Sequence, residues 1–143
     1  MTVAYQIKEA DTQLSRTNIE RRRLGPRDVR IDLKFCGICH SDLVAASDKL
    51  GGGIFPMVPG HEMVGTVSEM GTDVEDFAVG DAVGVGCIAD SCRSCHSCNM
   101  GDEHYCEKGF TLSFNSRDRE GRVNYGGYSS DYVVDYDYLV PIP

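Results

Sequence analysis

The sequence lacks three features that would assign it to common functional classes. No apolar run approaches the ~18 residues of a membrane-spanning helix. A signal peptide needs an unbroken apolar stretch near its start, and Lys8, Glu9 and Asp11 interrupt any such stretch here, so we expect a cytoplasmic protein without a membrane partner. Basic charge is scarce, because 14 Lys and Arg face 22 Asp and Glu, and the net charge of −8 argues against nucleic-acid binding.

The composition is that of a folded globular chain. Its 143 residues match the size of one ordinary domain, which can bury a core of its own. Hydrophobic residues make up 41% and charged residues 25%, which argues against disorder. The 16 glycines favour many turns and short strands. We therefore expect a mostly β single domain over residues 1–143.

The clearest local pattern is an alternation of apolar and polar residues over 28–35. Val29, Ile31, Leu33 and Phe35 share one face, and this period of two predicts a half-buried strand. Ser41 or Asp42 can cap a short helix that follows. Further strands are predicted at 63–67, 79–85, 128–134 and 138–142.

One basic run, Arg21-Arg22-Arg23, stands out against the acidic total. Glu20 precedes it directly, and charge runs of this length are mostly solvated. We expect this run to form an exposed loop or strand edge.

Four of the seven cysteines have the spacing of a metal site. Cys92, Cys95, Cys98 and Cys106 follow the pattern C-x2-C-x2-C-x7-C. Two residues between cysteines allow a tight turn to bring both sulfurs to one ion, and four thiolates at about 2.3 Å complete the closed tetrahedron of structural zinc. Because residues 86–108 show little apolar periodicity, we predict that zinc organises them into an irregular lobe.

Other interpretations of the cysteines are less favoured. A [4Fe–4S] cluster typically has three residues before its last cysteine and then proline, whereas this chain has seven residues and then Glu107. Free or disulfide-bonded cysteines are a further alternative, although an odd count in a cytosolic chain argues against disulfides. Residues 36–40 and 92–96 both match C-x-x-C-H, the haem attachment pattern, but no export signal accompanies them.

A second constellation combines Cys39 with His61 and Glu62. The pair His61-Glu62 follows a loop rich in Gly and Pro over 51–60 and opens the strand predicted at 63–67. A thiolate and an imidazole from neighbouring loop ends suit an open zinc site, where water or substrate takes one position. Taken alone, one cysteine and one histidine are weak evidence for such a site.

Longer sequence motifs strengthen this interpretation. In order along the chain they are GICHSDL at 37–43, PMVPGHEMVGTV at 56–67, VGDAVGVGC at 79–87, CRSCHSCNMGDEHYC at 92–106 and YGGYSSDYVV at 125–134. Together they closely resemble the amino-terminal catalytic domain of zinc-dependent medium-chain alcohol dehydrogenases, in particular the cinnamyl-alcohol-dehydrogenase-like branch. The resemblance covers nearly the whole chain. It implies a GroES-like, partly open β-barrel with short helices and a zinc-organised lobe.

The resemblance also implies an activity and its cofactors. The family interconverts alcohols and aldehydes by hydride transfer to or from NADP or NAD, with zinc polarising the alcohol oxygen. His40 corresponds to a side chain near the cofactor pyrophosphate. A homodimer formed through a further domain is also implied.

Roles for individual side chains follow from the same resemblance. Cys39 and His61 correspond to ligands of the catalytic zinc, and Glu62 to a neighbouring carboxylate that can approach the metal. Asp42 corresponds to the group that hydrogen-bonds a ligating imidazole and fixes its tautomer. Ser41 corresponds to the hydroxyl that passes the alcohol proton outward. For Cys87, a place in the substrate pocket and a buried structural role stay equally open.

The chain departs from the family pattern at several points. It contains no G-x-G-x-x-G turn, so we expect the Rossmann cofactor domain to be absent from residues 1–143. Family members take a third zinc-binding cysteine from the segment that follows, which leaves the catalytic site short of a ligand. Val44 stands where many relatives have a histidine that ends a proton relay, and Leu50 stands where many have tryptophan.

Two functional hypotheses remain open from the sequence. The chain is either part of a full dehydrogenase or a free-standing zinc module with a structural or binding role and no turnover. In either case the isolated chain should hold one zinc tightly at the four cysteines. A second zinc should bind weakly or use Glu62 as a substitute third ligand, and alcohols should not be oxidised.

Overall fold

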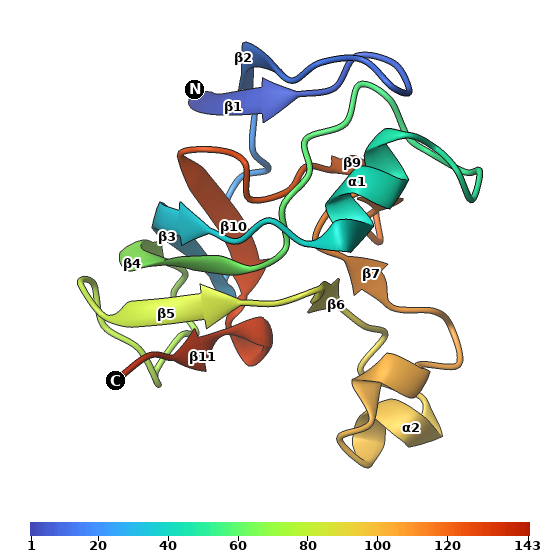
Figure 1. Ribbon diagram of the computed structural model, residues 1–143. Helices are drawn as coiled ribbons and strands as arrows, with labels where there is room; N and C mark the ends of the chain where they lie inside the picture. Colours follow the sequence, from blue (N-terminus) through green and yellow to red (C-terminus); the bar gives the residue numbers. More distant parts are fainter.

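The computed structural model describes residues 1–143 and consists mainly of short strands (Figure 1). The strands are β1 (Thr2–Gln6), β2 (Ser15–Ile19), β3 (Asp28–Cys36), β4 (Met63–Met70), β5 (Ala82–Val85), β6 (Ile88–Asp90), β7 (Thr111–Leu112), β8 (Ser116–Arg117), β9 (Val123–Asn124), β10 (Asp131–Asp135) and β11 (Val140–Pro141). The helices are α1 (His40–Ala46), α2 (His96–Asn99) and two 3₁₀ turns, Glu103–Tyr105 and Tyr136–Tyr138. The expected mostly β architecture is confirmed.

The helices are too short to reach across a lipid bilayer, because α1 has seven residues and α2 has four. None of them therefore qualifies as a membrane span. The cytoplasmic location expected from the sequence stays a prediction.

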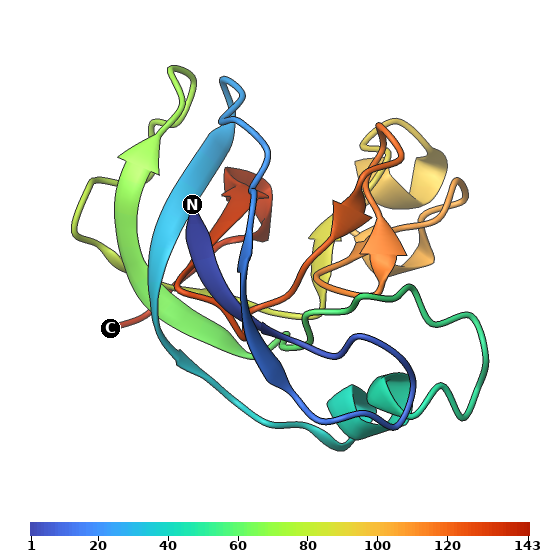
Figure 2. The ribbon, with the colours of Figure 1, turned by 90° about the horizontal axis from the view of Figure 1, so that it is seen from above.

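A five-stranded antiparallel sheet forms the body of the molecule, in the order β10-β3-β4-β5-β11. Figure 2 shows that the long strands β3 and β4 curve strongly, so that the sheet closes part of a barrel. Its inner face carries the main core, a cluster of ten buried side chains that includes Val29, Ile31, Val67 and Tyr132. These β-branched and aromatic residues are the ones that pack well on a pleated surface. Burial of these side chains on the inner face thus explains the apolar positions in the sequences of the strands.

The alternation predicted for β3 holds at Val29 and Ile31 and fails at its end. Both residues are fully buried, Leu33 is half-buried, and Phe35 is 76% exposed. The register between β3 and β4 shifts between Leu33 and Phe35, and such a β-bulge turns the following side chains away from their expected face. The bulge also redirects the chain as it leaves the sheet towards α1.

The amino-terminal hairpin of β1 and β2 was not predicted from the sequence. It packs on a separate small core in which Ala4 and Val58 are fully buried. Its attachment to the rest of the molecule uses the main chain, since the Tyr5 amide donates to the carbonyl of Tyr128 at 2.8 Å. The hairpin therefore covers the segment that precedes β10.

The prediction that the run Arg21-Arg22-Arg23 is solvated was wrong for its first two residues. The Arg21 guanidinium is enclosed, and burial lowers the pKa of this side chain to about 10. It donates to three main-chain carbonyls, those of Tyr125, Gly126 and Asp131. Arg22 forms an ion pair with Asp28, and only Arg23 is exposed. The acceptors of Arg21 lie more than 100 positions along the chain, where no local pattern reveals them, whereas Arg22 pairs with a residue six positions away.

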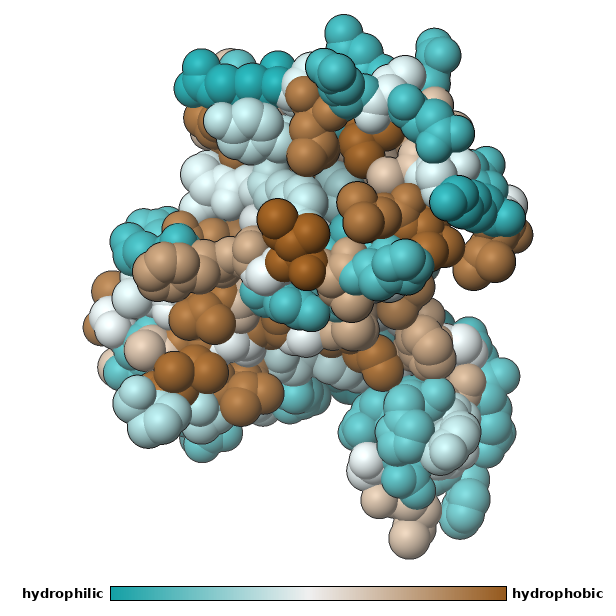
Figure 3. All heavy atoms as spheres, viewed as in Figure 1, coloured by the Kyte–Doolittle hydropathy of each residue, from teal (hydrophilic) through white to brown (hydrophobic).

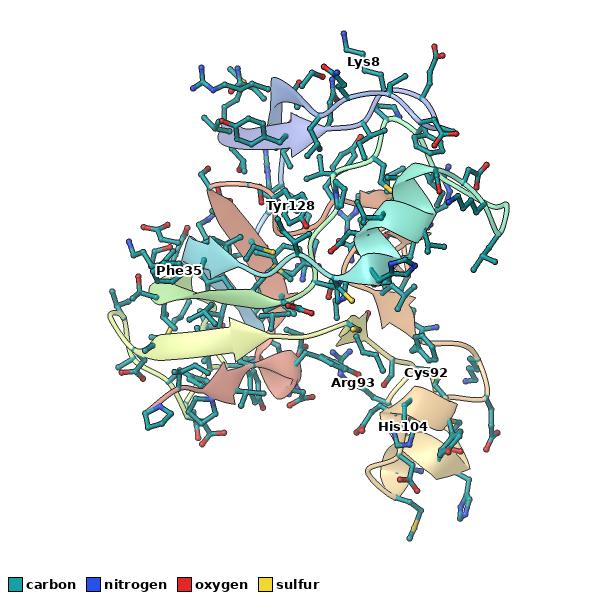
Figure 4. The ribbon with its side chains drawn as sticks, viewed as in Figure 1. Lys8, Phe35, Cys92, Arg93, His104 and Tyr128 are labelled. Carbon is teal, nitrogen blue, oxygen red and sulfur yellow. The ribbon has the colours of Figure 1, made fainter.

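The cysteine-rich segment forms a lobe that projects from the body at β6 and β7 (Figure 1). On the face shown in Figure 3, hydrophilic side chains cover most of the lobe, whereas apolar ones gather over the body. Arg93 lies between the two (Figure 4) and forms ion pairs with Asp90, Asp135 and Asp137. These ion pairs tie the lobe to the end of β10.

Candidate metal centres

Four cysteine sulfurs gather in the lobe between β6 and β7. The Sγ atoms of Cys92, Cys95, Cys98 and Cys106 all lie within 4.8 Å of one another, and those of Cys92 and Cys98 are 3.8 Å apart. Four thiolates at about 2.3 Å from a tetrahedral zinc ion are themselves about 3.8 Å apart. All seven cysteines are free thiols. The sulfur arrangement therefore fits the predicted zinc site.

The surroundings lower the pKa of Cys92 and Cys106 and so favour thiolates there. At Cys98 the hydrogen bond with Ser91 is outweighed by burial and by the neighbouring Cys95 and Cys106, which raise the pKa of Cys98 to about 11. Hydrogen bonds, first of all from the main-chain amide of Ser94, lower the pKa of Cys92 to about 5. The Cys92 amide in turn points at the Sγ of Cys106, 3.5 Å away. The buried cluster of the lobe consists of cysteines alone, without aliphatic side chains. A metal ion is thus the natural partner to hold this segment together.

A second group of candidate ligands lies where β3 ends and β4 begins. The donor atoms of Cys39, His61 and Glu62 all lie within 4.8 Å of one another. Cys39 is the N-cap residue of α1, and the pair His61-Glu62 directly precedes β4. The Gly37 amide donates to the carbonyl of Glu62 at 2.9 Å, which extends the pairing of β3 and β4 to the ligand positions. The structure thus brings these three predicted residues together.

Asp42 joins two of these ligands. Its carboxylate is 2% exposed and accepts from the Cys39 amide at 3.0 Å and from His61 Nδ1 at 3.2 Å. The predicted cap of α1 needs correction: the N-cap is Cys39, two residues before Ser41 and three before Asp42. Asp42 instead reaches back to the N-cap amide from the first turn, as in a capping box.

The His61 ring is held on three sides. The carboxylate of Asp42 can only accept a hydrogen bond, so the hydrogen in this contact lies on Nδ1 of His61. In the neutral ring, Nε2 then keeps its lone pair. The Ser41 hydroxyl lies 3.3 Å from Nε2. The Phe114 ring stacks on the imidazole with centroids 5.5 Å apart and planes 12° apart. These contacts point the free nitrogen of a buried imidazole towards the group of ligands, and Phe114 was not predicted to take part.

A cleft of about 350 Å³ opens beside this group. Ser41 and His61 line it together with Cys87, so the pocket position for Cys87 is the alternative that the structure favours. Cys87 is also exposed, which is inconsistent with a buried structural role. The remaining walls are Val44, Ala45, Asp48, Leu50, Gly51, Leu112, Phe114 and Asn115.

Three histidines lie outside both clusters. His40 is the first residue of α1 and is exposed, and it does not line the cleft. His96 and His104 are exposed on the lobe, as expected for solvated residues, and Figure 4 marks the position of His104. Of the predicted site residues, only His40 therefore stands apart from the metal centres.

Comparison with known proteins decides the family. Residues 25–143 match the family model described as the alcohol dehydrogenase GroES-like domain. The chain belongs to this family. Within the alcohol dehydrogenases, the probable formaldehyde dehydrogenase AdhA of Bacillus subtilis (strain 168) is 51% identical over 142 residues, which are 99% of this chain and 41% of that protein.

Solved structures of alcohol dehydrogenases agree with this assignment. The CAD from Helicobacter pylori complexed with NADP(H) superposes with a TM-score of 0.95 at 37% identity, over 99% of this chain and 41% of that chain. The cinnamyl alcohol dehydrogenase SbCAD4 from Sorghum bicolor gives a TM-score of 0.95 at 40% identity, over 100% and 41%. The family and fold inferred from the motifs are confirmed. The chain spans about two fifths of the length of these relatives.

Proposed function

We propose that residues 1–143 form the metal- and substrate-binding part of a zinc-dependent alcohol dehydrogenase that interconverts alcohols and aldehydes with NADP or NAD. The observation that supports this most is the convergence of Cys39, His61 and Glu62 beside a largely apolar cleft. Related proteins described as NADP-dependent alcohol dehydrogenases, in mycobacteria, agree with it.

In this proposal Cys39 and His61 are zinc ligands, and Glu62 is the carboxylate that can approach the metal. The donor set of thiolate, imidazole and carboxylate suits an open zinc site. A bound zinc ion would supply Lewis-acid chemistry towards an alcohol or carbonyl oxygen. The four cysteines of the lobe are proposed to hold a second, structural zinc. A third protein ligand to the catalytic metal would come from outside residues 1–143.

The chain's own residues would orient the ligands and move a proton. Asp42 holds the hydrogen on His61 Nδ1 and so keeps Nε2 free to bind metal. Ser41 is exposed, and its hydroxyl lies beside that nitrogen, where it can accept a proton from a bound alcohol. Because Val44 cannot continue a proton relay, Ser41 would pass the proton to solvent or to cofactor hydroxyls.

The dinucleotide requires a separate nucleotide-binding domain, because residues 1–143 contain no glycine-rich phosphate-binding turn. His40 is proposed to approach the cofactor pyrophosphate, and its exposure leaves it free to do so. NADP is the preferred cofactor in this proposal, since the CAD from Helicobacter pylori is complexed with NADP(H).

The walls of the cleft favour an alcohol or aldehyde with an apolar body. Leu50, Leu112 and Phe114 contribute apolar surface, and they would exclude water from the reacting carbon. Related proteins carry names as different as formaldehyde dehydrogenase and cinnamyl alcohol dehydrogenase. We therefore propose a substrate class and no single substrate.

A chimera tests the proposal. Residues 1–143 would replace the matching segment of AdhA, to which they are 51% identical. We expect the purified chimera to reduce aldehydes with NADPH, and this turnover to vanish on metal removal and in the variants Cys39→Ser and His61→Ala. The chain alone should show no turnover with either cofactor.

The control is His104→Ala, because this exposed histidine of the lobe lies outside both clusters. It should keep the activity of the parent chimera. Turnover that survives Cys39→Ser would contradict the assigned ligand. A folded chimera that binds two metal ions and never turns over would favour the free-standing zinc module instead.

A further inference from the structure

The Asp42 carboxylate accepts four hydrogen bonds, which is the full capacity of its two oxygens. Oδ1 accepts from the Gly60 amide at 2.9 Å and from His61 Nδ1 at 3.2 Å. Oδ2 accepts from the Cys39 amide at 3.0 Å and from the Tyr128 hydroxyl at 3.2 Å. Three of these donors belong to the segments that carry the metal ligands. Tyr128 comes from a distant part of the chain.

Tyr128 is fixed in place by its own main chain. Its amide donates to the carbonyl of Pro59 at 2.9 Å, and its carbonyl accepts from the Tyr5 amide at 2.8 Å. Gly127 adds a bond to the carbonyl of Gly60 at 2.9 Å. Figure 4 shows the side chain between the β1–β2 hairpin and β3. The hydroxyl therefore reaches Asp42 from a backbone that is already paired to the loop before His61.

The Tyr128 hydroxyl can act only as a donor to Asp42. Burial, and then the negative charge of Asp42, raise the pKa of Tyr128 above its usual value, so the hydroxyl keeps its proton at neutral pH. The same hydroxyl lies 3.5 Å from the carbonyl of Gly37, a second acceptor on the ligand-bearing segment. Hydrogen bonds to a charged acceptor are stronger than neutral ones.

We propose that Tyr128 is a positioning residue for the candidate catalytic metal centre. Its hydroxyl completes the set of donors around Asp42, and Asp42 holds the Cys39 amide and the His61 imidazole in fixed relation to each other. Tyr128 does not line the cleft, and its shorter hydroxyl contact is with Asp42 at 3.2 Å, so we expect its effect to pass mainly through Asp42. This inference rests on the proposed function of Cys39, His61 and Glu62 as a metal site.

The test is a titration of the full 143-residue chain with Co²⁺ or Zn²⁺, in which the four-cysteine site serves as an internal reference. In Tyr128→Phe we expect the affinity of the second site to fall about tenfold, the lower end for partners beyond the ligands, with an altered visible spectrum of the second Co²⁺. The four-cysteine site should keep its affinity and spectrum. Tyr125→Phe is the matched control, since the Tyr125 ring packs on the small core and not at Asp42.

A second measurement needs no metal. Nitrogen chemical shifts of the His61 ring should report the Nδ1–H tautomer in the parent chain and a shift towards a tautomer mixture in Tyr128→Phe. In an Asp42→Asn background, Tyr128→Phe should reduce the metal affinity of the second site by a smaller factor than in the parent, because the Tyr128 hydroxyl acts through Asp42.

The outcomes separate this inference from the proposed function. If neither the parent chain nor the chimera with AdhA binds a second metal ion, the metal site itself is refuted, and the inference with it. If the parent binds it and Tyr128→Phe matches the parent in affinity, Co²⁺ spectrum and His61 shifts, the inference alone fails. An equal loss in Tyr125→Phe, or at the four-cysteine site, would also overturn it, since the effect would then be a general loss of structure.

Discussion

Gly37 lies against the side chain of Glu62 in the second metal centre. A Cβ atom added there would lie 2.0 Å from Oε2 of Glu62, well inside contact distance. The backbone of Gly37 does not need the left-handed region, so this close approach is the sole reason for glycine. The carboxylate is the far end of a flexible side chain and can turn away, and the Cβ of Glu62, 3.0 Å from the added atom, has to yield by only a few tenths of an ångström.

Gly37→Ala should therefore displace the Glu62 carboxylate and spare the fold. We expect the second metal ion to bind about tenfold more weakly, while the four-cysteine site is unchanged. Isothermal titration with zinc measures both sites. Gly86→Ala is the control, because a Cβ at Gly86 meets open space. A second site of parental affinity in Gly37→Ala would show that Glu62 does not contribute.

At the residue scale, the structure brings together residues from motifs that the sequence analysis singled out, and it adds contacts that no motif indicated. The roles of Cys39, His61, Glu62 and Asp42 were expected from the family resemblance of the motifs that contain them, because one cysteine and one histidine at their spacing are weak evidence alone. Phe114 was missed, because its stacking on His61 joins segments that no local pattern connects. The Tyr128 hydroxyl bond spans 86 positions and leaves no trace in local periodicity either.

At the scale of elements, the lobe and the strands of the main sheet are stabilised in different ways. Its buried cluster contains only cysteines, so it has no apolar core of its own. The ion pairs of Arg93 attach it to the body but leave its interior unsupported. Its order should therefore depend on the bound metal.

Removal of zinc by a chelator should loosen the lobe and leave the body folded. We expect main-chain amides between Cys92 and Cys106 to lose most of their protection from hydrogen exchange, because local unfolding no longer costs the metal-binding energy. Amides of β3 and β4 should keep theirs. Cys98→Ser should reproduce the effect, whereas Cys87→Ser, outside the cluster, should not. Full protection after chelation would mean that the lobe is stable without metal.

Whether a strand could be predicted from the sequence depended on the size of the side chains at its buried positions. The alternation in β3 was readable because large apolar residues occupy its buried positions. In β1 the buried positions are Thr2 and Ala4, while Tyr5 is 49% exposed, so its pattern is not that of a half-buried strand. The bulge after Leu33 also escaped prediction, since it depends on pairing with β4.

At the scale of the whole molecule, the pH dependence of stability can be argued from the ion pair of Arg22 with Asp28. Asp28 opens β3 and accepts from both terminal nitrogens of Arg22 and from the Gly25 amide at 2.6 Å. Burial by itself would raise the pKa of Asp28, but these hydrogen bonds outweigh it and lower the pKa below its usual value. The charged form thus stabilises the fold above about pH 4, and the contribution is lost as the pH falls through the lowered pKa.

Asp28→Asn should lower the free energy of unfolding at pH 7 by about 2 kcal/mol, the magnitude of hydrogen bonds to a charged group. The difference from the parent should shrink as the pH falls below about 4, where the parent loses the same interaction. Urea unfolding at several pH values measures it. Asp76→Asn, at an exposed position, should change little. A gap equally large at pH 3 and pH 7 would contradict the assignment to charge.

The contacts of Arg21 have a consequence for how this domain can be trimmed. The match to the family model begins at residue 25, yet the guanidinium of Arg21 donates to three carbonyls of the segment from Tyr125 to Asp131. A shortened version that starts at residue 25 would leave these carbonyls without their hydrogen-bond donor and would expose Val58 to solvent. The folded domain therefore extends beyond the segment that the family model matches, and a shortened version of it should keep residues 1–24.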